Sequence, residues 1–70
     1  MRYYFHVRRG QVTVLDHKGA ELSDIQEVAR RAREIAASET LKGAPTRGGS
    51  IIVDDGSVTI LELPLEEVAR

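Results

Sequence analysis

The chain has 70 residues with ten basic and eleven acidic side chains, a formal net charge of −1, and no cysteine. This near-balance excludes an overall positive field that would recruit nucleic acid or an anionic membrane. The absence of cysteine excludes disulfides and thiolate zinc sites. No apolar run approaches the roughly 18 residues of a membrane span, and the N-terminus lacks the plan of a secretory signal. We therefore expect one small domain over residues 1–70, located in the cytoplasm.

The first part of the chain predicts a β-hairpin, with strands at residues 2–8 and 11–15. Aromatic and β-branched residues alternate with polar ones in both segments, which is typical of strands buried on one face. The interruption at Gly10 is where we expect the turn. The side chains expected to face the core are Tyr3, Phe5, Val7, Val12 and Val14. A type I turn at residues 16–19, which begins with Asp and ends with Gly, then leads through a short link into a helix.

Residues 24–38 predict an amphipathic α-helix, because their apolar residues fall on one arc of about 120°. That arc, which we expect to be buried, contains Ile25, Val28, Ala29, Ala32, Ile35 and Ala36. Ser23, with Gln26 three residues later, predicts a capping box at the helix start. Glu39 falls back inside the apolar arc, so we expect fraying from there and an end by Lys42. On the outer face we expect ion pairs at helical spacing among Glu27, Arg30, Arg31 and Glu34.

Residues 50–53 and 58–63 predict a second hairpin, because the Asp55-Gly56 pair between them favours a tight turn. A polar, glycine-rich connector at residues 44–49 precedes this hairpin, and one helical turn is expected at residues 65–69. The element order is therefore ββαββ, which is typical of an α+β fold. We predict a four-stranded, mostly antiparallel sheet, with the first strand central and one amphipathic helix packed on one face.

Four segments together resemble a known class of proteins. They are R-Y-Y-F-H-V-R at residues 2–8, D-x-x-G-x-E-L at 16–22, A-R-R-A-R-E at 29–34 and the closing V-T-I-L-E-L-P-L. The chain resembles a family of short uncharacterised bacterial proteins, a domain-of-unknown-function class common in soil alphaproteobacteria. The opening motif of that family, two aromatic residues, His and Arg, corresponds here to Tyr4, Phe5, His6 and Arg8. The resemblance implies no activity, and Arg9 stands where the family more often has an acidic residue.

A second resemblance, in topology alone, is to the small N-terminal domains of HicB-type antitoxins. Those domains also run from strands through a glycine turn into a capped helix, but they have a further strand before the helix and a DNA-binding segment afterwards. This chain is expected to have room for neither. The resemblance implies a nucleic-acid-binding or antitoxin-like regulator, which we keep as the alternative function.

One candidate binding surface lies on the side of the first predicted strand away from the helix. It consists of Arg2, Tyr4, His6 and Arg8. This row could hold an anion or an RNA phosphate. We favour the alternative that these are ordinary solvent-facing residues of a half-buried sheet.

A candidate dimer face follows from the last hairpin, because strand alternation leaves apolar residues on both of its faces. The residues expected to face away from the helix are Ile52, Leu61 and Leu63, with Tyr4 and Leu15 beside them. An exposed apolar patch of this kind usually marks an interface, and two-fold pairing is its commonest form. The competing possibility is that the C-terminal turn, through Leu65 and Val68, folds over this face and leaves a monomer.

The chain lacks the residue patterns of a catalytic or cofactor site. The histidines His6 and His17, with Asp16 beside the second, match no metal-ligand spacing. The turn aspartates Asp16, Asp54 and Asp55 are better explained as turn formers than as ligands or bases. The glycines before residue 50 lead into a strand and not into a helix, so they form no phosphate loop. We expect no catalytic residue, no metal and no cofactor.

The favoured hypothesis is a non-enzymatic domain that binds or regulates another macromolecule. Its expected partner is a copy of itself, in a homodimer, with a second protein as a further partner. The near-neutral charge favours this hypothesis over a nucleic-acid-binding regulator, which a clustered basic sheet face would favour. Neither nucleic acid nor a membrane is expected as a partner.

Overall fold

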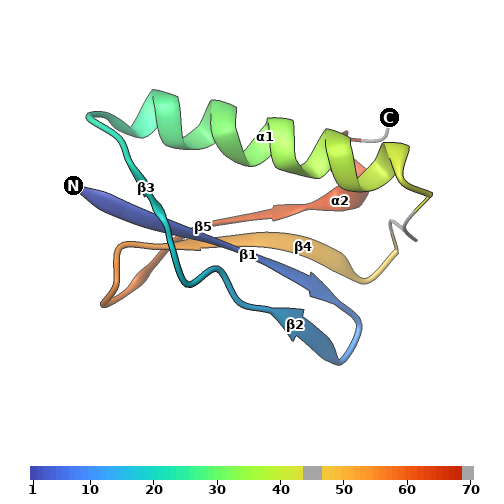
Figure 1. Cartoon of the computed structure of the whole chain (residues 1–70). Coiled ribbons are helices and arrows are strands. Elements are labelled where there is room, and N and C mark those ends of the chain that lie inside the picture. The colour runs from blue at the N-terminus through green and yellow to red at the C-terminus, as the bar shows by residue number, and fades with distance from the viewer. Residues whose placement is uncertain (44–46, 69–70) are drawn as a thin grey trace.

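The computed structural model describes residues 1–43 and 47–68 and shows a sheet with a helix on one side (Figure 1). In chain order the elements are β1 (Arg2–Arg9), β2 (Val12–Val14), β3 (Ala20–Glu21), α1 (Ile25–Leu41), β4 (Gly49–Asp54), β5 (Thr59–Pro64) and α2 (Leu65–Val68). All strand pairs are antiparallel. The predicted α+β fold is therefore confirmed. The addition is β3, two residues of the predicted link that pair with the start of β1.

The sheet has the strand order β2-β1-β4-β5, with β3 also paired to β1. β1 is therefore central, as predicted. Its hairpin with β2 turns through only two residues, since Arg9 pairs directly with Val12. Gly10, the first of the two, has a φ of 59°, a left-handed conformation that glycine adopts without strain.

α1 begins at Ile25, with Asp24 as its N-cap. The Asp24 carboxylate accepts a hydrogen bond from the Glu27 amide at 2.9 Å, and the Ser23 hydroxyl donates to the Glu27 carboxylate at 3.2 Å. The predicted capping box of Ser23 and Gln26 is therefore wrong by one residue. The cap uses the expected chemistry, an acidic oxygen that satisfies a free amide of the first turn, one position later.

The end of α1 differs from the prediction at Glu39, because the helix continues without fraying to Leu41. The Glu39 side chain is only 11% exposed, and it forms ion pairs with Arg9 and, at 3.2 Å, with Lys42. A carboxylate is tolerated inside an apolar arc when cations pair with it. Glu39 therefore ties the last turn of α1 to the end of β1.

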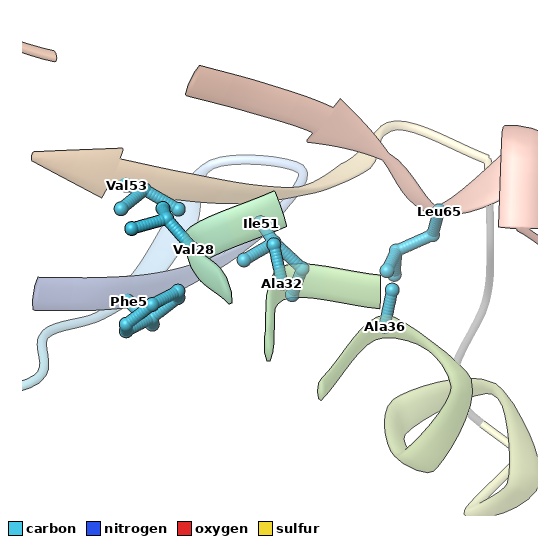
Figure 2. Packing of buried hydrophobic residues seen from close by; sticks show 7 residues of the cluster. All are labelled: Phe5, Val28, Ala32, Ala36, Ile51, Val53 and Leu65. Carbon is cyan, nitrogen blue, oxygen red and sulfur yellow. The ribbon is translucent and has the colours of Figure 1, made fainter. Parts of the chain in front are cut away.

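The core consists of seven buried apolar residues, which are Phe5, Val28, Ala32, Ala36, Ile51, Val53 and Leu65. Figure 2 shows three levels along the helix: Val28 near Val53 and Phe5, Ala32 near Ile51, and Ala36 with Leu65 pointing toward it. The two alanines allow α1 to approach the sheet closely. The predicted inward face of β1 is confirmed, since Tyr3 and Val7 also pack against this cluster.

α1 covers only part of the sheet, because it packs on β4, β5 and α2 (Figure 1). Val12 and Val14, which were expected in the core, are 66% and 61% exposed. Alternation identified the side of the sheet they occupy but not how far the helix extends over it. Ile25, expected to be buried, is 58% exposed, and Ile35 is partly buried.

One strand of the last hairpin, β5, turns the opposite face to the core from the one expected. Leu61 and Leu63 pair with Val53 and Ile51 and pack against the core, so their predicted place on the outer face is wrong. A two-residue turn at Asp55-Gly56 would pair Val53 with residue 58. Instead residue 54 pairs with residue 59, and a register shift at this point pairs Val53 with Leu61. The partner of Val53 is thus displaced along β5 by an odd number of residues. Because side chains alternate along a strand, the displacement turns Leu61 and Leu63 to the helix side.

The segments that flank the last hairpin are a connector before β4 and a short helix after β5. The connector predicted at residues 44–49 lies partly outside the described residues, and Gly49 opens β4. The helical turn predicted at residues 65–69 is present as α2, although residue 69 lies outside the described residues. Leu65 is fully buried in the core, so it does not cover the outer face as the monomer alternative required. Neither helix of the described chain is long and apolar enough to cross a membrane.

Candidate functional site

The outer face of the sheet, the side away from α1, carries the candidate row that was predicted on β1. Opposite this row on β4 stand Asp54, Ile52 and Ser50, which pair with Tyr4, His6 and Arg8. The structure therefore brings the row together on one face, as alternation requires. Its side chains are not free, however, and their partners decide what the face can do.

His6 lies between Asp54 and Asp16, and we call these three residues the His6 cluster. The ring atom His6 Nε2 lies 2.6 Å from Asp54 Oδ2, and His6 Nδ1 accepts a hydrogen bond from the Asp16 amide at 3.0 Å. The His6 side chain is 14% exposed. The favoured interpretation of this row as solvent-facing is therefore wrong for His6, because two turns enclose its ring with polar groups.

These hydrogen bonds define the tautomer of His6. Since a backbone amide can only donate, Nδ1 is the acceptor, and Nε2 carries the proton that it donates to Asp54. A general base needs a free ring nitrogen within reach of its substrate. Both nitrogens of His6 are engaged, so the cluster holds two turns against β1 and offers no free base.

Asp16 completes the edge of β1 where the backbone ladder is interrupted. β2 pairs with the end of β1 and β3 with its start, and between them the Phe5 amide donates to Asp16 Oδ2 at 3.1 Å. Asp16 Oδ1 accepts from the amides of Lys18 and Gly19, both at 3.1 Å. Burial raises the pKa of Asp16, but the amides of Gly19, Phe5 and Lys18 and the nearby His6 lower it, and the net pKa falls below the ordinary 3.8.

The turn-forming role expected for the aspartates is confirmed. Asp16 closes the first turn. In the second hairpin, Asp54 Oδ1 accepts a hydrogen bond from the Gly56 amide at 2.9 Å, and Asp55 Oδ1 accepts from the amides of residues 57 and 58. Asp54 therefore has two functions, since its other oxygen contacts His6. One carboxylate both closes the β4–β5 turn and fixes the histidine of β1.

The cations of the candidate row are paired with carboxylates. Arg2 donates to the Lys18 carbonyl at 2.6 Å and lies 3.8 Å from Glu21. Arg8 donates to Glu62 at 2.7 Å and to the Ser50 hydroxyl at 3.3 Å. Binding of a phosphate would have to compete with these partners. Over the described residues, the outer face is therefore not a basic patch.

The candidate dimer face does not form as one surface. Ile52 alone of its three members stays on the outer face, where it is partly buried beside His6 and Glu62. Leu61 and Leu63 lie on the helix side. The outer face consequently has no continuous apolar patch built from these residues.

An exposed apolar surface occurs instead at the β2 edge. The Phe5 amide points toward the β2 side of β1, so the amides of the other odd-numbered residues of β1 point the same way. The partners of Val7 and Arg9, which are Val14 and Val12, therefore direct their backbone groups to β1. The amide and carbonyl of Thr13 therefore point away from the sheet. With Leu15, which is 55% exposed, the two valines give this edge three exposed apolar side chains.

The described residues contain no group of three or more histidine or acidic side chains placed to hold a metal ion. His17 is exposed on its turn and is not part of the His6 cluster. The chemistry expected of a zinc or nickel site needs imidazole and carboxylate ligands that converge. In the His6 cluster the ring and both carboxylates are already hydrogen-bonded to one another or to backbone amides.

Sequence reasoning found the row and the turns but not their connection. Nothing in the spacing of His6, Asp16 and Asp54 shows that two turns meet at one histidine. The available signal was the polarity of His6 beside two apolar neighbours, together with aspartates at both turns. The β2 edge was missed because its valines were assigned to the core.

The family described as Domain of unknown function (DUF6894) matches residues 2–66, which is nearly the whole chain. No curated protein matches the chain, and no solved structure matches it.

Proposed function

We propose that this chain, which belongs to the family described as Domain of unknown function (DUF6894), is a non-enzymatic protein-binding domain that forms a homodimer. The supporting observation is the edge at β2, where residues 11–15 carry no charge and both valines are more than half exposed. Edge strands are normally protected by charge, by proline or by a covering element. An edge without such protection is one to which another strand can add.

The opposite edge of the sheet shows these protective features. β5 carries the charged Glu62 and ends at Pro64, which has no amide hydrogen to donate. α2 follows directly and packs against β4 and β5. Since β2 has no charge and no proline, we place the partner at the β2 edge.

A second copy matches this edge by two-fold symmetry. Antiparallel pairing centred on Thr13 would let the two threonines exchange both backbone hydrogen bonds and would set Val12 opposite the partner's Val14. The two sheets would then join into one, with four valines in contact on the helix side. Two-fold pairing is the commonest closed arrangement of identical surfaces.

The alternatives are supported less well. An acid–base enzyme would need a free nitrogen on His6, whose two ring nitrogens are engaged. A nucleic-acid-binding or HicB-like regulator would need unpaired cations, whereas Arg2 and Arg8 contact acidic partners. A bacterial source, a cytoplasmic location and an aromatic-aromatic-His-x-Arg family motif are further parts of the proposal.

Sedimentation equilibrium at micromolar concentrations tests the homodimer. Thr13→Pro removes only an amide that points away from β1, so we expect a folded monomer. Val12→Lys adds charge to the same edge and should also give a monomer. The matched control is Val58→Lys, at a position that is 58% exposed but lies in the other hairpin. It should leave the dimer intact.

Two results would refute the proposed dimer. One is a monomeric mass for the unchanged chain at concentrations up to about 100 µM, with the far-ultraviolet circular dichroism of a folded protein. The other is a dimer that survives both edge variants and dissociates in Val58→Lys. The second result would move the interface to the β4–β5 hairpin.

A further inference from the structure

The helix side of the sheet has an uncovered half. The axes of four strands about 4.8 Å apart span roughly 14 Å, and the sheet is roughly 19 Å wide when the half-width of each edge strand is included, whereas a helix with its side chains is about 10–12 Å wide. α1 packs on β4 and β5, so a strip of roughly 7–9 Å over β1 and β2 stays uncovered, somewhat narrower than one helix. A groove of about 370 Å³ lies there, with Phe5, Val7 and Val14 among its lining residues and Ile35 of α1 beside them.

The groove is bordered by two cations. Arg31 of α1 and Lys18 of the 16–19 turn both line it, and both are exposed. The ion pairs formed within the described part of the chain involve neither residue. The ion pairs expected among Glu27, Arg30, Arg31 and Glu34 are therefore absent from this part of the chain. Arg31 and Lys18 can accept acidic partners from outside.

One acidic residue also lines the groove, and its position matters for a negatively charged ligand. Asp16 directs its carboxylate to the amides of Phe5, Lys18 and Gly19. Those amides offset much of its charge, as they do for any carboxylate that accepts several backbone hydrogen bonds. The groove therefore combines apolar side chains with a net cationic border.

We infer that this groove binds an amphipathic helix of another protein, with its apolar face on Val14, Leu15 and Ile35 and acidic side chains near Arg31 and Lys18. A helix is favoured over an extended strand, because a strand lying over apolar side chains would leave its backbone amides without partners. A helix satisfies its own amides and uses only its side chains in the contact. This inference goes beyond the homodimer and does not require it. The dimer pairs the backbone of β2, whereas the helix lies over the side chains of the groove, and Val14 would contact both partners.

The test uses three fluorescein-labelled designed peptides of 18 residues. Two of them place leucines on one helical face. The first carries glutamates beside that face, the second carries lysines there, and the third is a scrambled form of the first. Each is titrated with the full chain and followed by fluorescence anisotropy, and the bound site is mapped by amide chemical shifts. We expect only the glutamate peptide to bind, with shifts at Val14, Leu15 and Ile35 and weaker affinity at high salt.

A matched pair of variants tests the charge argument. Arg31→Glu should weaken the glutamate peptide about threefold to tenfold and strengthen the lysine peptide, because it replaces an attraction with a repulsion. Arg33→Glu makes the same change on the same exposed helix outside the groove, and it should alter affinity less than about twofold. Both substitutions are at exposed positions, so circular dichroism should show an unchanged fold.

Several outcomes would overturn the inference. They are equal binding of the glutamate and lysine peptides, equal effects of Arg31→Glu and Arg33→Glu, chemical shifts confined to the outer face, or no binding at millimolar peptide. If Arg31→Glu instead changes the mass of the protein alone, the groove is part of the self-association surface, which also contradicts the inference. If the peptides do not bind but Thr13→Pro still dissociates the dimer, this inference is wrong and the proposed homodimer is still supported.

Discussion

Replacement of Asp16 by alanine should destabilise the fold more than its place in a surface turn would indicate. The carboxylate accepts amide hydrogen bonds from Phe5, Lys18 and Gly19, and hydrogen bonds to charged groups contribute about 1.5–3 kcal/mol each when they are well shielded. Two of these amides lie in a turn that water can reach, so their share is smaller. The Phe5 amide, in contrast, loses the acceptor that fills the gap in the β1 edge. We expect a total loss of about 2–4 kcal/mol.

Urea unfolding followed by far-ultraviolet circular dichroism measures this loss, and its pH dependence tests the cause. The pKa of Asp16 in the folded state lies below its ordinary value of 3.8. Its stabilisation is therefore present above that ordinary value and is lost as the pH falls through the folded-state pKa. The difference between the unchanged chain and Asp16→Ala should be largest near pH 7 and should shrink below about pH 4.

Two further variants separate charge from turn formation. Asp16→Asn keeps one acceptor oxygen without the charge, so its cost should be intermediate. Asp55→Ala removes a carboxylate whose two hydrogen bonds among the described residues stay within its own turn, and it should cost less than Asp16→Ala. A loss below about 1 kcal/mol for Asp16→Ala at pH 7, or a loss that stays constant to pH 2.5, would refute this role of Asp16.

Three other substitutions should show graded losses in the same unfolding assay. Val28→Ala should cost about 2–3 kcal/mol, because Val28 is fully buried, and Ile25→Ala, at a mostly exposed position, should cost less than about 1 kcal/mol; equal costs would contradict the described core. Arg9→Met should cost about 1–3 kcal/mol, because it leaves the mostly buried Glu39 carboxylate with Lys42 as its one cation. Glu39→Gln, which removes the charge, should cost less, and a larger loss for Glu39→Gln would refute the pairing. Gly19→Ala should cost about 2 kcal/mol or more, since φ is +71° and the added Cβ would lie 2.8 Å from the Tyr3 carbonyl oxygen. Gly10→Ala, where the added Cβ meets nothing within 4 Å, should cost about half as much. An equal loss of stability for the two variants would show that close packing at Gly19 does not matter.

The sequence predicted the elements of this fold well because their signals are local. Helical spacing identified Val28 and Ala32 as buried, and the turn residues marked both hairpins. Strand alternation also assigned the correct inner face to β1. Each of these inferences depends on residues that are neighbours along the chain, whose geometry is set by the backbone periods.

The failures concern relations between distant segments. Leu61 was assigned to the wrong face because an extra residue in the last hairpin displaces the register, and composition does not reveal such a shift. Val12 was assigned to the core because strand alternation does not show how much of the sheet the helix covers. The contact of His6 with two turns depends on strand order, which the sequence did not determine.

The same limits apply to the candidate sites. The row on β1 was correctly placed on one face, but its cations have acidic partners on other elements, such as Glu62 on β5. Those partners change the row from a possible anion site to a neutral surface. The groove beside Arg31 was not predicted at all, because it exists only where α1 leaves β2 uncovered.

The most direct test of the proposed interface is the hydrogen exchange rate of the Thr13 amide at two protein concentrations, about 10 µM and 1 mM. This amide points away from β1, so it should exchange rapidly in the monomer and slow markedly where a second copy pairs with β2. The amide of Glu62, at the protected edge, should exchange at the same rate in both samples. A Thr13 rate that does not depend on concentration, while the Glu62 amide slows, would contradict the assignment of the β2 edge as the site of self-association.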